Sequence, residues 1–158
     1  MRRWITAETF GKGGRMALGQ RPVELPADAV VSITLATNLS LRQFVMGALV
    51  SQLIMRQCRK APGLLYAEVA ADYDGRYSYT LSLWSGPEMR AFRDKRSHGW
   101  AMRKMAWLFY GEAAEAWFLT YRTDTLPAFR EAMETARRHG RHFKAGMQLR
   151  PQSPPVRA

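Results

Sequence analysis

"LLYAEVAADYDGRYSYTLSLW", Leu64–Trp84, holds two runs of apolar and aromatic residues on either side of a short polar turn. Leu and Tyr occur in both runs, with Val in the first and Thr and Trp in the second, which is typical of β-strands. Asp74-Gly75 between them is a strong hairpin signal, because such turns require a positive φ that glycine adopts at little cost. The stretch therefore predicts two antiparallel strands, Leu64–Asp72 and Arg76–Trp84.

A strand and a helix are expected before this hairpin. Ala29–Thr37, "AVVSITLAT", is rich in β-branched residues and bounded by turn residues, which predicts a strand. Ser40–Gln43, "SLRQ", is a capping-box pattern, in which the Ser and Gln side chains satisfy free N–H groups at a helix start. We expect this helix to end near Arg59, before Pro62-Gly63, and its apolar stretch Phe44–Met55 to be buried.

A helix, a strand and a last helix are expected after the hairpin. Ser85–Glu88 is a second capping box, with proline in the first turn, where its missing N–H does no harm. The helix that follows is expected to be jointed near Ser97–Gly99 and to continue to the region of Tyr110. Glu115–Thr123 predicts another strand, and the last helix is expected to start near Thr125.

The resulting order, β-α-β-β-α-β, predicts an α+β ferredoxin-like fold with a four-stranded antiparallel sheet plus a C-terminal helix. Large side chains fall on both sides of the predicted strands, so we expect the sheet to be covered on both faces. A homodimer that packs sheet on sheet, a dimeric α+β barrel, would supply the second cover. We place the domain at residues 26–145, between an irregular N-terminal extension, 1–25, and a proline-rich tail, 146–158.

Composition restricts the classes of protein. A chain of 158 residues with 47% hydrophobic residues is long enough for one core, and its single cysteine excludes a disulfide framework. No apolar run reaches the roughly 18 residues of a membrane span, and we expect a cytoplasmic protein. The net charge of +11 comes mostly from scattered arginines. The basic cluster Arg137–Lys144 is expected to be a solvated helix end, with nucleic-acid binding a minor alternative.

Trp84, His98 and Asn38 are residues for which the sequence leaves both a functional and a structural role open. Trp84 shares a strand side with Thr80 and Ser82, whose small side chains leave space beside the indole; packing at the dimer interface is the alternative. A neutral imidazole can ligate haem iron, although His98 also suits a helix joint, where histidine interacts with free carbonyls. Asn38 directly precedes a helix start, and a local turn or cap role is its alternative.

Further candidates come from the spacing of aromatic, methionine and arginine residues. Methionine adapts to flat aromatic ligands, but a methionine stripe at helical spacing is also typical of a core. Arginines near the expected pocket mouth suit haem propionates, although exposed helix arginines are common. The candidates are Tyr77, Tyr79, Met89 and Phe92 for a substrate pocket, and Arg93 and Met102 beside a cofactor.

"APGLLYAEVA", the hairpin and "TLSLWSGPEMRAFRDKRSHGWAM" resemble the dimeric α+β barrel monooxygenase superfamily, and most of all its spheroidene-monooxygenase-like branch. The shared pattern is Pro-Gly before the second strand, Trp at the end of the third, Ala-Phe in the helix, and His followed by Ala-Met. In haem-degrading members an Asn, a Trp and a His surround the haem, and Asn38, Trp84 and His98 lie in comparable places. The carotenoid-oxygenase branch implies that His98 is an axial haem ligand.

The sequence and this resemblance together predict a haem-binding monooxygenase-like enzyme that oxidises a hydrophobic, carotenoid- or polyketide-like substrate in a pocket between sheet and helices. His98 would ligate the iron, Trp84 would line the pocket, and Asn38 would hydrogen-bond oxygen or substrate. One alternative is a cofactor-free oxygenase or isomerase of the antibiotic-biosynthesis type. Another is a non-catalytic dimer that binds a small ligand.

Overall fold

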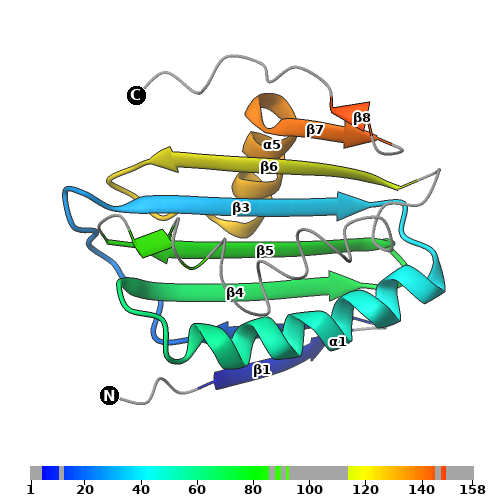
Figure 1. Cartoon of the computed structure of the whole chain (residues 1–158), viewed down its shortest axis with the longest axis horizontal. Coiled ribbons are helices and arrows are strands. Elements are labelled where there is room, and N and C mark those ends of the chain that lie inside the picture. The colour runs from blue at the N-terminus through cyan, green and yellow to red at the C-terminus, as the bar shows by residue number, and fades with distance from the viewer. Residues whose placement is uncertain are drawn as a thin grey trace.

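The computed structural model of the chain describes residues 5–10, 13–85, 88–89, 92, 114–144 and 147–148. In these ranges the eight strands form one antiparallel sheet in the order β1-β2-β4-β5-β3-β6-β7-β8 (Figure 1). The strands are β1 (Ile5–Phe10), β2 (Gly13–Leu18), β3 (Val30–Thr37), β4 (Leu64–Asp72), β5 (Tyr77–Trp84), β6 (Glu115–Arg122), β7 (Arg141–Lys144) and β8 (Met147–Gln148). The longest described helices are α1 (Leu41–Cys58) and α5 (Phe129–His139).

The four central strands have the predicted ferredoxin-like arrangement. β3 lies between β5 and β6, and β4 pairs with the other edge of β5, all antiparallel. The α+β class is therefore confirmed, with strand bounds within one residue of those expected from the sequence. The sheet is wider than the predicted four strands, because β2 extends it beside β4 and β7 extends it beside β6.

The N-terminal region is not the irregular extension that the sequence predicts over residues 1–25. Ile5–Phe10 and Gly13–Leu18 pair as a hairpin, and its second strand pairs with β4 from Gly13 opposite Asp72 to Leu18 opposite Ala67. The glycines and isolated charges give this region no clear period, but the free edge of β4 supplies the backbone partners that define it as a strand. Most of the predicted tail, 146–158, lies outside the described residues.

α1 starts at the predicted capping box. The Gln43 N–H donates to Oγ of Ser40 at 3.3 Å, and the Ser40 N–H donates to Oε1 of Gln43 at 2.8 Å. The turn between β4 and β5 differs from expectation, since the positive φ falls on Arg76, at 49°, and not on Gly75. The longer loop, closed by the Arg76 N–H donating to the Tyr73 carbonyl at 3.1 Å, accounts for this shift.

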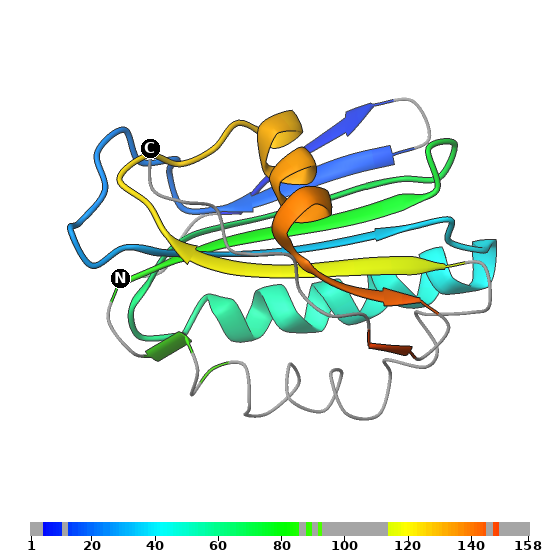
Figure 2. The same cartoon turned by 90° about the horizontal axis from the view of Figure 1, so that it is seen from above.

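The two helices lie on opposite faces of the sheet (Figure 2). Ala132 and Ala136 of α5 are fully buried against a cluster of aliphatic residues from β3 and β5. α5 starts at Phe129 and not near Thr125, because the residue before Pro127 is disfavoured in helical conformation. The second face of the sheet is thus covered in part by the same chain, and the homodimer stays a prediction.

The basic segment Arg137–Lys144 spans two elements. Its first residues form the last turn of α5, where cations interact favourably with free carbonyls, and the rest forms β7 at the edge of β6. His139 and His142 therefore do not share a helix. No helix in the described ranges is long and apolar enough to cross a membrane.

Candidate functional site

The face of the sheet that carries α1, here the α1 face, has small hydroxyl side chains at its centre. Alternate residues of β5 point to this face, and the register places Ser82, Ser32 and Thr120 in one row across three strands, with Thr80 beside Thr34 in the next. The Thr120 hydroxyl donates to Oγ of Ser32 at 3.4 Å. We call this set the hydroxyl floor: Ser32, Thr34, Ser78, Thr80, Ser82 and Thr120. Its members are half-buried except Thr120, which is exposed.

Trp84 closes one end of the hydroxyl floor. It follows Ser82 on the same side of β5, is 1% exposed, and belongs to a cluster that includes Met55 and Cys58 of α1. The Phe92 ring lies against the indole, with ring centroids 4.9 Å apart. Within the described ranges the indole Nε1 has no hydrogen-bond partner. A buried N–H without a partner costs about 1–3 kcal/mol, so a water or a ligand oxygen there would be strongly favoured.

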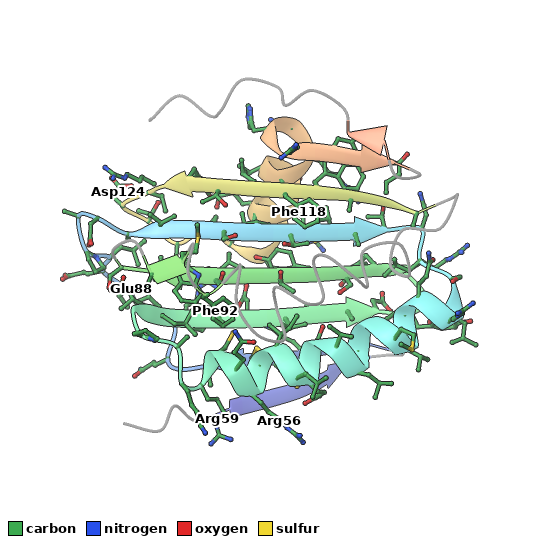
Figure 3. All side chains as sticks on the ribbon, viewed as in Figure 1. Arg56, Arg59, Glu88, Phe92, Phe118 and Asp124 are labelled. Atoms are coloured by element: carbon green, nitrogen blue, oxygen red, sulfur yellow. The ribbon has the colours of Figure 1, made fainter. Side chains whose placement is uncertain are left out.

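A second buried polar atom without a partner lies close to the Trp84 strand end. Oε2 of Glu88 is buried and accepts no hydrogen bond from the described part of the chain. A Cβ on Gly63 would lie 2.9 Å from this oxygen and 2.7 Å from the Ser85 carbonyl oxygen. The positive φ of 70° at Gly63 is a further reason for glycine there. Figure 3 shows Glu88 and Phe92 in front of the sheet, on the α1 face.

The predicted pocket residues divide between the two faces of the sheet. Met89 and Phe92 pack against the cluster that contains Trp84, as a shared site requires. Tyr77 and Tyr79 point to the opposite face, where both rings pack against α5. Successive side chains of a β-strand point to opposite faces, so the odd-numbered tyrosines of β5 and the even-numbered Trp84 lie on different sides of the sheet. The two tyrosines therefore cannot line the same site as Trp84.

Asn38 and Trp84 lie at opposite ends of the sheet. Trp84 pairs with Val30 at the start of β3, whereas Asn38 follows the last residue of that strand. Eight residues of extended chain separate the two ends by roughly 25 Å. Asn38 is exposed and has a φ of 58°, a conformation that asparagine adopts more readily than most residues. One small substrate would not contact both side chains.

His98, Arg93 and Met102 lie outside the described residues. Among the residues that the structure does describe, no group of three histidine, cysteine or acidic side chains could hold a metal ion. The haem ligand, its propionate partner and the neighbouring methionine therefore stay predictions.

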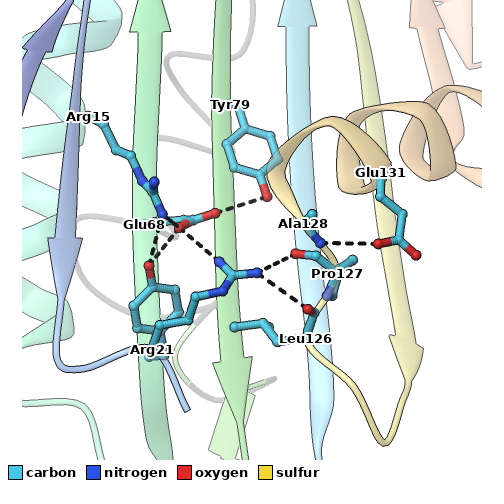
Figure 4. A network of polar contacts seen from close by, with 9 residues as sticks. Arg15, Arg21, Glu68, Tyr79, Leu126, Pro127, Ala128 and Glu131 are labelled. Carbon is cyan, nitrogen blue, oxygen red and sulfur yellow. Dashed lines mark hydrogen bonds and ion pairs between the residues drawn. The ribbon is translucent and has the colours of Figure 1, made fainter. Parts of the chain in front are cut away.

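A buried carboxylate on the opposite face was not anticipated (Figure 4). Glu68, in the middle of β4, is 1% exposed. Its Oε2 accepts hydrogen bonds from the Tyr66 hydroxyl at 2.6 Å and from Nη2 of Arg15 at 2.5 Å. Its Oε1 accepts one from the Tyr79 hydroxyl at 3.4 Å. A lone Glu in the apolar run "LLYAEVAAD" is the sequence signal, since a buried charge requires partners.

Arg21 connects this carboxylate to the segment before α5. Its Nη1 lies 3.4 Å from Oε2 of Glu68, while Nη2 donates to the carbonyls of Pro127 at 2.6 Å and Leu126 at 3.3 Å. Burial, followed by the charge of Glu68 and the hydrogen bond to it, raises the pKa of Tyr79 far above its ordinary value. Tyr79 therefore stays a protonated donor even at an alkaline pH at which a free tyrosine ionises. These contacts join β2, β4, β5 and the start of α5, which is a structural role.

Comparisons with known proteins do not assign the chain to a family. It matches no protein-family model and no curated protein. A crystal structure of a monooxygenase from the gene ActVA-Orf6 of Streptomyces coelicolor, in complex with the ligand Nanaomycin D, is similar with 22% identity and a TM-score of 0.43, over 65% of this chain and 94% of that one. The crystal structure of an anthrone oxidase-like protein is similar with 12% identity and a TM-score of 0.44, over 86% of this chain and 60% of that one. The fold assignment rests on strand order and register.

Proposed function

We propose that this chain is a monooxygenase-like enzyme that holds a flat or elongated hydrophobic molecule against the hydroxyl floor, with Trp84 at one end. The observation that carries the proposal is a buried indole N–H, without a described partner, at the end of a strip of small hydroxyl side chains. A packed interior would fill such positions with large aliphatic residues, as the opposite face does. The resemblance of "TLSLWSGPEMRAFRDKRSHGWAM" to monooxygenases supports the reaction class.

Each residue of this site has a binding role in the proposal. The Trp84 N–H donates to an oxygen atom of the substrate. This hydrogen bond orients the ring or chain of the substrate that is to be oxidised. The Phe92 ring and the Met89 side chain contact the apolar faces of the substrate. The hydroxyl floor offers donors and acceptors along the length of β5, so that a substrate with several oxygen atoms is held in one register.

Haem is a further part of the proposal. When bound, it would supply the oxygen chemistry, while the chain supplies orientation and a site with little water. The described side chains beside Trp84 are mostly apolar or aromatic and fit the face of a flat macrocycle, but they include no imidazole. His98, Arg93 and Met102 would hold the group, and no role assigned above depends on it.

Filling the hydroxyl floor tests the substrate site. Thr80→Leu adds apolar volume at its centre, and Thr125→Leu makes the same change at an exposed loop position. Binding of a hydroxylated anthracene, an electron-rich flat probe, is measured by equilibrium dialysis together with oxygen consumption. We expect Thr80→Leu to weaken binding by about tenfold or more through steric exclusion, and Thr125→Leu to bind like the wild type. Equal binding by both variants would refute the site.

An absorbance spectrum tests the haem hypothesis separately. Protein reconstituted with haem is expected to show a Soret band that His98→Ala abolishes and His142→Ala retains. The second variant is a control because His142 lies in β7, away from Trp84. A band that survives His98→Ala would remove His98 from the mechanism without affecting the substrate site.

A further inference from the structure

The outward surface of α1 is apolar where a surface helix is normally polar. Leu41, Val45, Leu49 and Leu53, spaced four residues apart, are 58%, 48%, 58% and 47% exposed. Spacing of four places them along one side of the helix, and we call them the aliphatic stripe. The prediction that Phe44–Met55 is buried holds only for one side of the helix, where Gly47, Val50 and Met55 are buried. The exposed stripe on the other side needs another explanation, because contiguous exposed apolar surface marks an interaction site.

Positive charge surrounds the aliphatic stripe. α1 contains two arginines and no acidic residue between Leu41 and Cys58, and both Arg42 and Arg56 are exposed. Because an α-helix turns by about 100° per residue, Arg42 and Arg56 point in directions that lie between those of Leu41 and Leu53 around the helix axis. Arg59 and Lys60, directly after the helix, are also exposed, and Figure 3 shows Arg56 and Arg59 pointing away from the sheet.

We propose that the aliphatic stripe of α1 rests on an anionic lipid surface, with α1 parallel to the membrane plane. Apolar side chains flanked by arginines are the pattern of helices that lie in the lipid headgroup region. A second copy of the chain fits less well, because it would bring like charges together around the stripe. A nucleic acid would satisfy the arginines but not the leucines. The net charge of +11 adds long-range attraction to anionic membranes. This inference does not depend on the proposed function.

Vesicle co-sedimentation tests this surface. The full chain is mixed with vesicles of phosphatidylcholine alone or of phosphatidylcholine with phosphatidylglycerol. We expect binding to the anionic vesicles only, weakened by salt. The double variant Leu49→Ser/Leu53→Ser should bind about tenfold more weakly or worse, and Arg42→Gln/Arg56→Gln should lose about fivefold per charge removed. Val23→Ser is the matched control, because Val23 is 95% exposed and lies in the loop before β3.

Three results would overturn the proposal. The wild type could fail to sediment with anionic vesicles, or the leucine variant could bind as well as Val23→Ser. Analytical ultracentrifugation could also show that the wild type is a dimer and the leucine variant a monomer. The stripe would then be a contact between two copies of the chain. The substituted side chains are largely exposed, so unchanged thermal unfolding of every variant is expected and excludes loss of fold as the cause.

Discussion

The two faces of the central sheet differ in what they bury. On the α5 face, β3 and β5 place Val31, Ile33, Leu81 and Leu83 in a core in which each is at most 1% exposed. On the α1 face, the residues between them are hydroxyl side chains that stay half-buried. The same strands therefore build a closed core on one side and a half-buried row of hydroxyl side chains on the other. The first contributes most to stability, and the second is the surface that we propose for binding.

Polar groups on the two faces are also treated differently. Glu68 on the α5 face has four side-chain partners and is closed off from solvent. On the α1 face the Trp84 N–H and a Glu88 oxygen are buried without a hydrogen-bond partner among the described residues. A third such atom, Nε2 of His142, lies on the side of Trp117 and is 3.7 Å from Oε2 of Glu115. Satisfied buried networks stabilise a fold, whereas unsatisfied buried atoms require an explanation such as an absent water or ligand. Two such atoms lie close together at the Trp84 end of the hydroxyl floor, which is why we propose the site on the α1 face.

The largest expected effect separates two neighbouring residues of β5. Leu81→Ala removes a side chain that is 1% exposed in the α5-face core, and we expect a loss of about 2–5 kcal/mol in the free energy of unfolding. Thr80→Ala truncates the hydroxyl floor and should cost less than about 1 kcal/mol. Urea denaturation of both variants measures the difference. Equal losses would show that the α1 face is packed as tightly as the other.

Glu68→Ala should be the next most severe change. It leaves two arginines and two tyrosine hydroxyls without their shared acceptor, which costs about 3–5 kcal/mol when the partners are buried. Arg15 and Arg21 are 34% and 35% exposed and regain solvent, so we expect about 2–3 kcal/mol. Probe binding at the hydroxyl floor should be unchanged below the unfolding transition. Weaker probe binding by folded Glu68→Ala would show that the Glu68 network affects the hydroxyl floor, and would contradict the assignment of stability and binding to different faces.

Alkaline pH should destabilise the α5 face. Burial, followed by the charge of Glu131, raises the pKa of Tyr121 from 10.0 to about 12. When the pKa of a group is higher in the folded than in the unfolded state, its contribution to stability is fully present below the unfolded-state pKa. This contribution is lost as the pH rises through the folded-state pKa. The free energy of unfolding should therefore fall between about pH 10 and pH 12, and less steeply in Tyr121→Phe. Denaturation series at several pH values measure this, and identical slopes would remove Tyr121 as a cause.

The smallest expected effect concerns Asn38, at the far end of β3 from Trp84. Asn38→Ala should cost about 1 kcal/mol because alanine is disfavoured at a φ of 58°, whereas Asn38→Gly should be close to neutral. If the residue serves the backbone turn, the glycine variant keeps full oxygen consumption. Loss of activity in both variants at unchanged stability would instead support the predicted catalytic role.

Local signals were enough for the order and bounds of the four central strands and of α1, whereas most of the helix predicted between β5 and β6 lies outside the described residues. The hairpin Leu64–Trp84, the capping box at Ser40 and the alternation along β5 all act over a few residues, and each is visible in the chain. The candidate site was only partly predictable. Trp84, Met89 and Phe92 come together as expected, but the strand period places Tyr77 and Tyr79 on the other face.

The amino-acid order of this chain was sufficient for its α+β class and for the two-sided pattern of β5, because helix caps, turns and alternation depend on near neighbours. The partner of each strand edge, the helix that covers each face and the cations around Glu68 depend on residues far apart in the chain. Arg15 lies 53 positions from Glu68, and β2 becomes a strand only beside β4. Contacts at such distances arise from packing of the whole sheet, so only the folded structure shows them.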